Sequence, residues 1–163
     1  MAKKEKEAKK VKDGLFPIFG EFDSWQEINE AAEGLRQEGD QNGLRTLAEE
    51  NGLEEEAESY LASDTAELCD PISAALGKIK REKEYEDNYL ADDVAEYLSA
   101  NCDDINFALS VRKKGKRLAE AAKRVQEEAK KHETIINNTT CWYCGPMKGY
   151  QLIREYYREG EAE

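Results

Sequence analysis

The chain has 163 residues and a formal net charge of −12, with 37% charged residues against 39% in the hydrophobic set. This length suits one ordinary domain or two very small ones, and a core can form only if the apolar positions are strictly patterned. No apolar run is long enough to cross a membrane and no signal peptide opens the chain, so we expect an intracellular protein. Four cysteines in that reducing compartment favour metal binding or buried thiols over disulfides.

The charge is unevenly distributed along the chain. Residues 1–13 form a basic tail of net charge +3, whereas residues 14–70 carry sixteen acids against two arginines, a net charge of −14. Residues 111–163 are mildly basic at +4. An acidic module repels nucleic acid and attracts basic surfaces, including the protein channels in which nucleic acid lies. The same acids could instead be a solvated helix surface without a partner. The sequence leaves both interpretations open, a module that binds a basic surface and a solvated surface.

Residues 14–70 are predicted to form a three-helix module. Ser24-Trp25-Gln26-Glu27 is typical of a capping box, Gly39 ends the first helix, and Asn51-Gly52 is a good C-terminal cap for the second. Asp64 can cap a short turn after the third helix. Each helix has one apolar face, so the three can pack as a small bundle. The apolar positions are Trp25, Ile28, Ala31, Ala32, Leu35, Leu44, Leu47, Ala48, Leu53, Ala57, Tyr60 and Leu61.

Residues 71–163 are predicted to form a long helical hairpin followed by a knuckle and a final helix. The arms of the hairpin are residues 71–100, which begin with proline at the first helical position, and residues 104–131. A break near residues 86–88 is an alternative. No period-2 alternation indicates a strand. The predicted fold class is therefore all-α: a helical bundle with a long antiparallel helix hairpin and a zinc-knuckle segment near the C-terminus.

The run Arg112–Arg117 lies in the middle of the second predicted arm. Its five cations could bind phosphate or the acids of a partner. They could also form an exposed helix face that balances the acidic module. With one histidine and no Gly-rich phosphate loop, the sequence does not indicate an enzyme.

The motif Cys141-Trp-Tyr-Cys144 is the strongest chemical signal, because two thiols at this spacing can face one metal ion. His132, the single histidine, lies nine residues before Cys141. In the predicted hairpin Cys69 lies at the same end as these residues, which favours a structural zinc site made by Cys69, His132, Cys141 and Cys144. A bend near Asn88 or Gly115 would bring Cys102 back as an alternative ligand. Inert buried thiols, or a redox pair at Cys141 and Cys144, also remain open.

Two parts of the sequence resemble known proteins. The stretch Ile18–Leu35, followed by Glu38-Gly-Asp40 and Leu47–Leu53, resembles an N-terminal module common in small proteins from mobile elements of gut Firmicutes. The segments Val94–Leu98 and Ile153–Tyr157 resemble PcfK-like proteins of conjugative plasmids. The Cys-x-x-Cys knuckle does not belong to this resemblance.

The resemblance implies a function, since some small acidic proteins of such elements are anti-CRISPR proteins. We therefore expect a protein in the cytoplasm of a bacterial host cell that binds a type II RNA-guided effector nuclease and blocks the loading of target DNA. We also expect a monomer without direct contact to nucleic acid or membrane. The alternative is a zinc-stabilised DNA-binding or conjugation accessory protein that uses Arg112–Arg117 and the basic tail.

Overall fold

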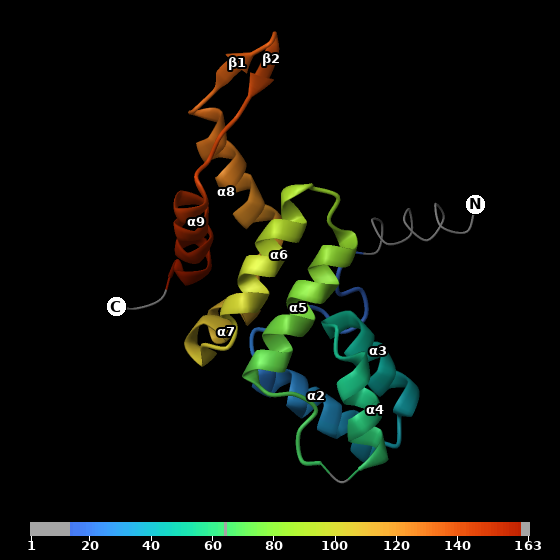
Figure 1. Ribbon diagram of the computed structural model, residues 1–163. Coiled ribbons are helices and arrows are strands. Elements are labelled where there is room, and N and C mark those ends of the chain that lie inside the picture. Colours follow the sequence, from blue (N-terminus) through green and yellow to red (C-terminus); the bar gives the residue numbers. More distant parts are fainter. Residues whose placement is uncertain (1–13, 64, 161–163) are drawn as a thin grey trace, which may run out of the picture.

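The computed structural model describes residues 14–63 and 65–160, so the predictions for residues 1–13 and for Asp64 lie outside the described residues. The described part of the chain forms eight helices and one two-stranded sheet (Figure 1). In chain order these are α2 (Trp25–Gln37), α3 (Gln41–Asn51), α4 (Glu54–Ala62), α5 (Pro71–Tyr85), α6 (Leu90–Asn101), α7 (Ile105–Arg112), α8 (Leu118–Lys130), β1 (Thr134–Ile136), β2 (Thr139–Cys141) and α9 (Pro146–Arg158).

The helices α2, α3 and α4 form the predicted N-terminal bundle, and their ends carry the predicted caps. The Ser24 hydroxyl accepts from the amide of Glu27, while the Glu27 carboxylate reaches back to the amide of Asp23. Gly52 ends α3 in the left-handed conformation, with φ of 66°. Apolar side chains from the three helices, the segment before α5 and the first turn of α5 make one core cluster, which includes Ile28, Ala32, Leu44, Leu47, Ala48, Leu53, Ala57, Tyr60, Leu68, Cys69 and Ala74.

Helix α5 connects this bundle to the rest of the molecule. Ala74 belongs to the N-terminal cluster, whereas Ala75 and Ile79 belong to a second cluster formed with the helices α6 to α9. The close crossing of α3 and α5 needs two glycines. A Cβ atom on Gly52 would lie 2.2 Å from the carbonyl oxygen of Gly77, and a Cβ atom on Gly77 would lie 2.3 Å from the carbonyl of residue 51. The acidic module is therefore packed backbone to backbone against α5.

The long helix hairpin predicted from the sequence is wrong, because both of its arms are broken. The segment 71–100 is interrupted at residues 86–89, near the break that the sequence offered as an alternative. The segment 104–131 is interrupted at residues 113–117, which separate α7 from α8. The resulting short helices enclose the second cluster, whose large members include Leu98, Phe107, Val111, Leu118, Ile153, Tyr156 and Tyr157.

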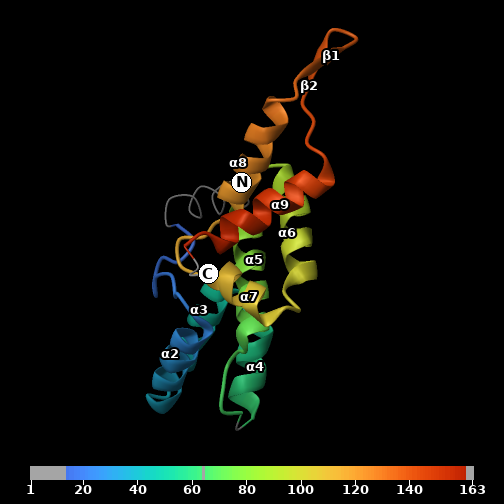
Figure 2. The same ribbon diagram turned by 90° about the vertical axis from the view of Figure 1, so that its left-hand side faces the viewer.

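Residues 131–145 form an arm that projects beyond the helices (Figures 1 and 2). The prediction of an irregular knuckle without strands is wrong here, since β1 and β2 pair as an antiparallel hairpin. Asn137 and Asn138 have φ of 50° and 62°. Positive φ at both central residues is the geometry of a type I′ turn, which suits the twist of a two-residue hairpin. The fold class is otherwise all-α, as predicted.

Candidate binding surfaces

Cys69 and Cys102 are buried thiols in two different clusters. Cys69 lies in the N-terminal cluster, with its Sγ 3.8 Å from the carbonyl oxygen of Trp25 and 3.6 Å from Oδ1 of Asn29. Burial raises the pKa of Cys69 to about 12 and that of Cys102 to about 11. Both thiols are therefore protonated and enclosed by protein, as an unreactive structural cysteine is.

The other three predicted zinc ligands lie on or beside the arm, at the opposite end of the molecule from the segment that precedes α5 (Figures 1 and 2). His132 is exposed, and its Nε2 lies 3.6 Å from Oε1 of Glu128. Cys141 ends β2, and Cys144 lies just before α9. Within residues 14–63 and 65–160, no three His, Cys, Asp or Glu side chains are gathered so that they could hold a metal ion. The structure does not bring Cys69 to the arm, and the zinc site stays a prediction.

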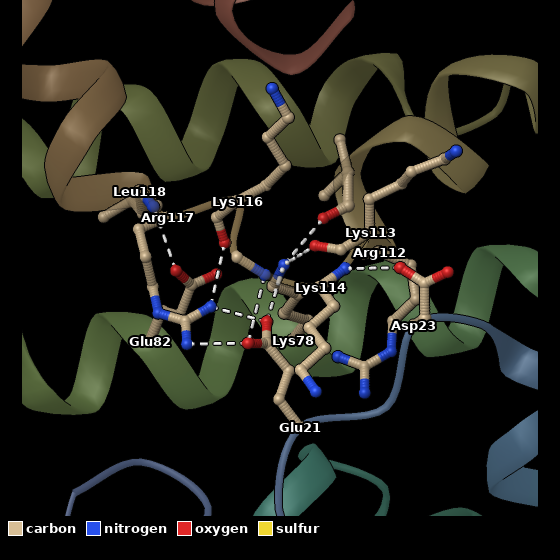
Figure 3. A network of polar contacts seen from close by, with 12 residues as sticks. Glu21, Asp23, Lys78, Glu82, Arg112, Lys113, Lys114, Lys116, Arg117 and Leu118 are labelled. Carbon is tan, nitrogen blue, oxygen red and sulfur yellow. Dashed lines mark hydrogen bonds and ion pairs between the residues drawn. The ribbon is translucent and has the colours of Figure 1, made fainter. Parts of the chain in front are cut away.

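The basic run Arg112–Arg117 spans the end of α7 and the loop after it (Figure 3). Lys113 and Lys114 are exposed there, whereas the other three cations join an internal polar network. Arg117 donates two hydrogen bonds to Glu21, and the buried Arg112 donates to Oδ1 of Asn51 at 2.8 Å. The Nζ atom of Lys116 donates to the carbonyl oxygen of Tyr156 at 2.6 Å. Three of the five cations in this run are thus used inside the molecule.

The same network caps the loop between α7 and α8. Three carboxylates accept from its backbone amides: Asp23 from residue 114, Glu21 from residue 115 and Glu82 from residue 118 (Figure 3). The Nζ atom of Lys78 donates to the carbonyl oxygens of residues 111 and 113, at 3.1 and 2.7 Å. Side chains that are distant in sequence thus form hydrogen bonds with these backbone amides and carbonyl oxygens. Helix α7 can therefore end here without leaving these groups unpaired.

Burial dominates the protonation of the network. It lowers the pKa of Lys78 to about 8, although the charges of Glu82 and Glu21 oppose this effect. Burial also raises the pKa of Glu82. For Glu21 the effect of burial is outweighed by the hydrogen bond from Arg117 and by the charge of Lys78, so its pKa lies below the ordinary value. The network is therefore sensitive to the loss of any one charge.

The acidic module presents carboxylates whose charges are largely uncompensated. Its two cations are already bound: Arg36 donates to three backbone carbonyls in and after α4, and Arg45 pairs with Glu58 at 2.9 Å. Eight other exposed carboxylates make no ion pair with any of the described residues. We call these the acidic surface: Glu30, Glu33, Glu38, Asp40, Glu49, Glu55, Glu67 and Asp70.

Large apolar side chains are exposed on and beside the arm. Ile135 and Ile136 are 73% and 59% exposed, and Met147 is 80% exposed. Trp142 and Tyr143, which lie between the two cysteines of the motif, are 47% and 66% exposed. A concentration of this kind marks an interaction surface more often than an isolated exposed residue does. The sequence contains a signal, because Trp142 and Tyr143 are an adjacent aromatic pair outside the periodic apolar pattern of the helices.

None of the described helices combines the length and apolar character that a membrane span requires. No family model, curated protein or solved structure matches this chain. The functional argument therefore depends on the surfaces themselves.

Proposed function

We propose that this protein is a protein-binding inhibitor, most concretely an anti-CRISPR protein that binds a type II RNA-guided effector nuclease and blocks target DNA loading. The observation that carries the proposal is the acidic surface on and around α2, α3 and α4, whose carboxylates have no cationic partner among the described residues. Such a surface can substitute for the phosphates of DNA in a basic channel, because a nuclease of this class holds nucleic acid in a positively charged groove.

The internal use of Arg112, Lys116 and Arg117 also favours this function over the alternative of a DNA-binding or conjugation accessory protein. A protein that binds duplex DNA needs accessible cations along one face. Here three of the five cations in the run 112–117 are bound inside the molecule, and the net charge of −12 opposes contact with phosphates. A mobility-shift assay with duplex DNA at low salt separates the two functions, since we expect no shift by this protein alone.

The decisive experiment measures cleavage and binding of target DNA by a guide-loaded type II nuclease, with and without the purified protein. We expect cleavage to fall and the nuclease–DNA complex to disappear at low salt. The effect should weaken steeply as salt rises, because an interface dominated by exposed charges is screened. Unchanged cleavage and unchanged DNA binding for a panel of such nucleases would rule the proposal out.

Matched charge variants locate the interface. A Glu30→Gln, Glu33→Gln, Glu38→Gln variant removes three charges from the acidic surface, and we expect it to inhibit about tenfold less well at low salt. The control neutralises three exposed acids elsewhere, at Glu84, Asp103 and Glu127. Equal losses for both variants would mean that net charge, and not the acidic surface, determines inhibition.

A further inference from the structure

A pocket between α7 and the C-terminal end of α9 collects positive charge. The two helices pack against each other (Figures 1 and 2), and the pocket between them has a volume of about 540 Å³. Lys113, Arg154 and Arg158 line it, together with one carboxylate, that of Asp104. This carboxylate accepts from two amides at the start of α7, so it is engaged in capping that helix. The lining therefore has an excess of cations.

Arg154 is held in place by groups that carry no negative charge. Its Nε and Nη2 atoms donate to the hydroxyl oxygen of Tyr97 and to Oδ1 of Asn101, each at 3.2 Å. The guanidinium also lies over the ring of Phe107, 5.0 Å from the ring centroid. These contacts fix its orientation without neutralising its charge, and its Nη1 atom makes no hydrogen bond within the described part of the chain. A guanidinium presented in this way suits a phosphate group.

The carboxylates on the same part of α9 are bound elsewhere. Glu159 pairs with Arg124, and Glu155 accepts from the side-chain amide of a glutamine one turn earlier on the helix. Lys113 and Arg154 make no ion pair with any residue that the structure describes. The charge of these two cations is thus available to a ligand.

Apolar side chains form another part of the wall. Phe107 and Leu109 of α7 line the pocket, and Leu109 is 36% exposed. The pocket has room for more than a phosphate group, so it suits an anion carried on an apolar or aromatic body. The net charge of −12 opposes a long polyanion, which favours a small ligand with one phosphate group.

We propose that this pocket binds a small phosphate monoester of the nucleoside monophosphate type. Lys113 and Arg154 hold the phosphate group, with Arg158 beside them. The planar guanidinium can donate to two phosphate oxygens, whereas the lysine adds a point charge. Phe107 and Leu109 contact the organic body. This inference does not depend on the proposed function, because the acidic surface belongs to the segment before α5 and the pocket to helices that follow it.

Calorimetric titration of the full chain at low salt tests each part of the ligand. We expect AMP to bind with a dissociation constant below about 1 mM, and excess inorganic phosphate to displace it. Adenosine, which has no phosphate group, should bind at least about tenfold more weakly. The proposal is overturned by weaker binding of AMP, by equal binding of adenosine, or by an excess of phosphate that displaces nothing.

Two adjacent lysines provide a matched pair of variants. Lys113 and Lys114 are both exposed on the loop after α7, but Lys114 does not line the pocket. We expect Lys113→Ala to raise the dissociation constant of AMP about tenfold, and Lys114→Ala to leave it within about twofold of the wild type. Equal effects of the two variants would mean that AMP responds to the general surface charge and would refute the pocket.

Variants of Arg154 test the geometry of the site. Arg154→Gln should weaken AMP binding about tenfold or more, and Arg154→Lys should weaken it less, because lysine keeps the charge but loses the planar fork. Circular dichroism shows whether each variant is folded, since Arg154 also contacts two residues of α6. Unchanged affinity in a folded Arg154→Gln variant contradicts the proposal, and the lysine pair decides the question if this variant unfolds.

A phosphorylated DNA end presents the same chemical group from a different source. A short single strand with a 5′-phosphate should bind no more tightly than AMP, because the negative charge of the protein repels the additional phosphates. Tighter binding of the strand than of AMP would show a nucleic-acid site and would refute the assignment of a small ligand.

Discussion

Glu21 and Arg117 are 96 residues apart in the sequence and are joined by two hydrogen bonds, of 2.5 and 2.8 Å. The same carboxylate lies 3.4 Å from Nζ of Lys78 and accepts from the amide of Gly115. Glu21 precedes α2, whereas its partners belong to α5 and to the loop before α8. Glu21 therefore holds the segment before α2 against α5 and the loop before α8.

We expect Glu21→Gln to lower the free energy of unfolding by about 3 kcal/mol, because the variant weakens the charged hydrogen bonds with Arg117 and removes one of the two carboxylate charges that stabilise the buried Lys78. Chemical denaturation followed by circular dichroism measures the change. Glu30→Gln, an exposed carboxylate on α2 with no ion pair among the described residues, is the control and should stay within about 0.5 kcal/mol of the wild type. A loss as small as that of the control would show that the network does not stabilise the fold.

Lys78 should make stability depend on alkaline pH. Burial lowers its pKa to about 8 in the folded chain, whereas an unfolded lysine titrates at about 10.4. Between these values the unfolded chain binds more protons at this residue, so the free energy of unfolding rises with pH. The cost of burying the ammonium group, on the order of 3 kcal/mol, is present in full below pH 8 and disappears above about pH 10.5.

The measurement compares the wild type with Lys78→Met over this pH range. Thiols and tyrosines titrate there in both proteins, so the difference between the two isolates the lysine. We expect the stability of the wild type relative to Lys78→Met to increase as pH rises. A difference that stays flat would mean that Lys78 titrates normally.

The local parts of the fold could be predicted because their determinants are neighbours in sequence. Ser24 and Glu27 cap α2 from within one turn, and Asp70 caps α5 through the amide of Ser73. The hairpin could also have been predicted, since Asn137-Asn138 stands between β-branched residues, which is a turn signal between strands. The strands were missed because each has only three residues and no buried face to produce an alternating pattern.

The break after α7 lies around Gly115, where the sequence offers a bend as an alternative, but local signals do not decide between the bend and a continuous helix. Val111 and Leu118 keep a helical spacing of seven residues across this segment. The acceptors for the amides of residues 114, 115 and 118 come from Asp23, Glu21 and Glu82, 36 to 94 residues away. The same fact explains why Arg112–Arg117 was interpreted as a surface run. The carboxylates that pair with this run are distant in sequence and become its neighbours only after folding. The predicted position of Cys69 near the other zinc ligands required the long hairpin, which this break removes.

The crossing of α3 and α5 gives a prediction about Gly52. Alanine there must adopt a positive φ, and its Cβ would lie 2.2 Å from the carbonyl oxygen of Gly77. We expect Gly52→Ala to cost about 3 kcal/mol, since the helices must separate as well as accept the strained backbone. Gly115→Ala is a matched control, because its φ is +84° but nothing lies within 4 Å of the added Cβ, so it should cost only about 1 kcal/mol. Equal thermal melting of the two variants would contradict the close crossing.

The cysteines give the test of the predicted zinc site. In metal-free protein, a thiol reagent should modify Cys141 and Cys144 quickly, whereas Cys69 and Cys102 should react only on unfolding, because burial raises their pKa to about 12 and 11. A Cys141→Ser, Cys144→Ser variant should lose the fast phase. If purified protein contains one zinc per chain, the fast phase should appear only after a chelator, together with a lower melting temperature. Metal-free protein whose melting temperature is unchanged by zinc or chelator would leave these two residues as ordinary, partly exposed thiols. Fast modification of Cys69 would contradict its enclosure in the N-terminal cluster.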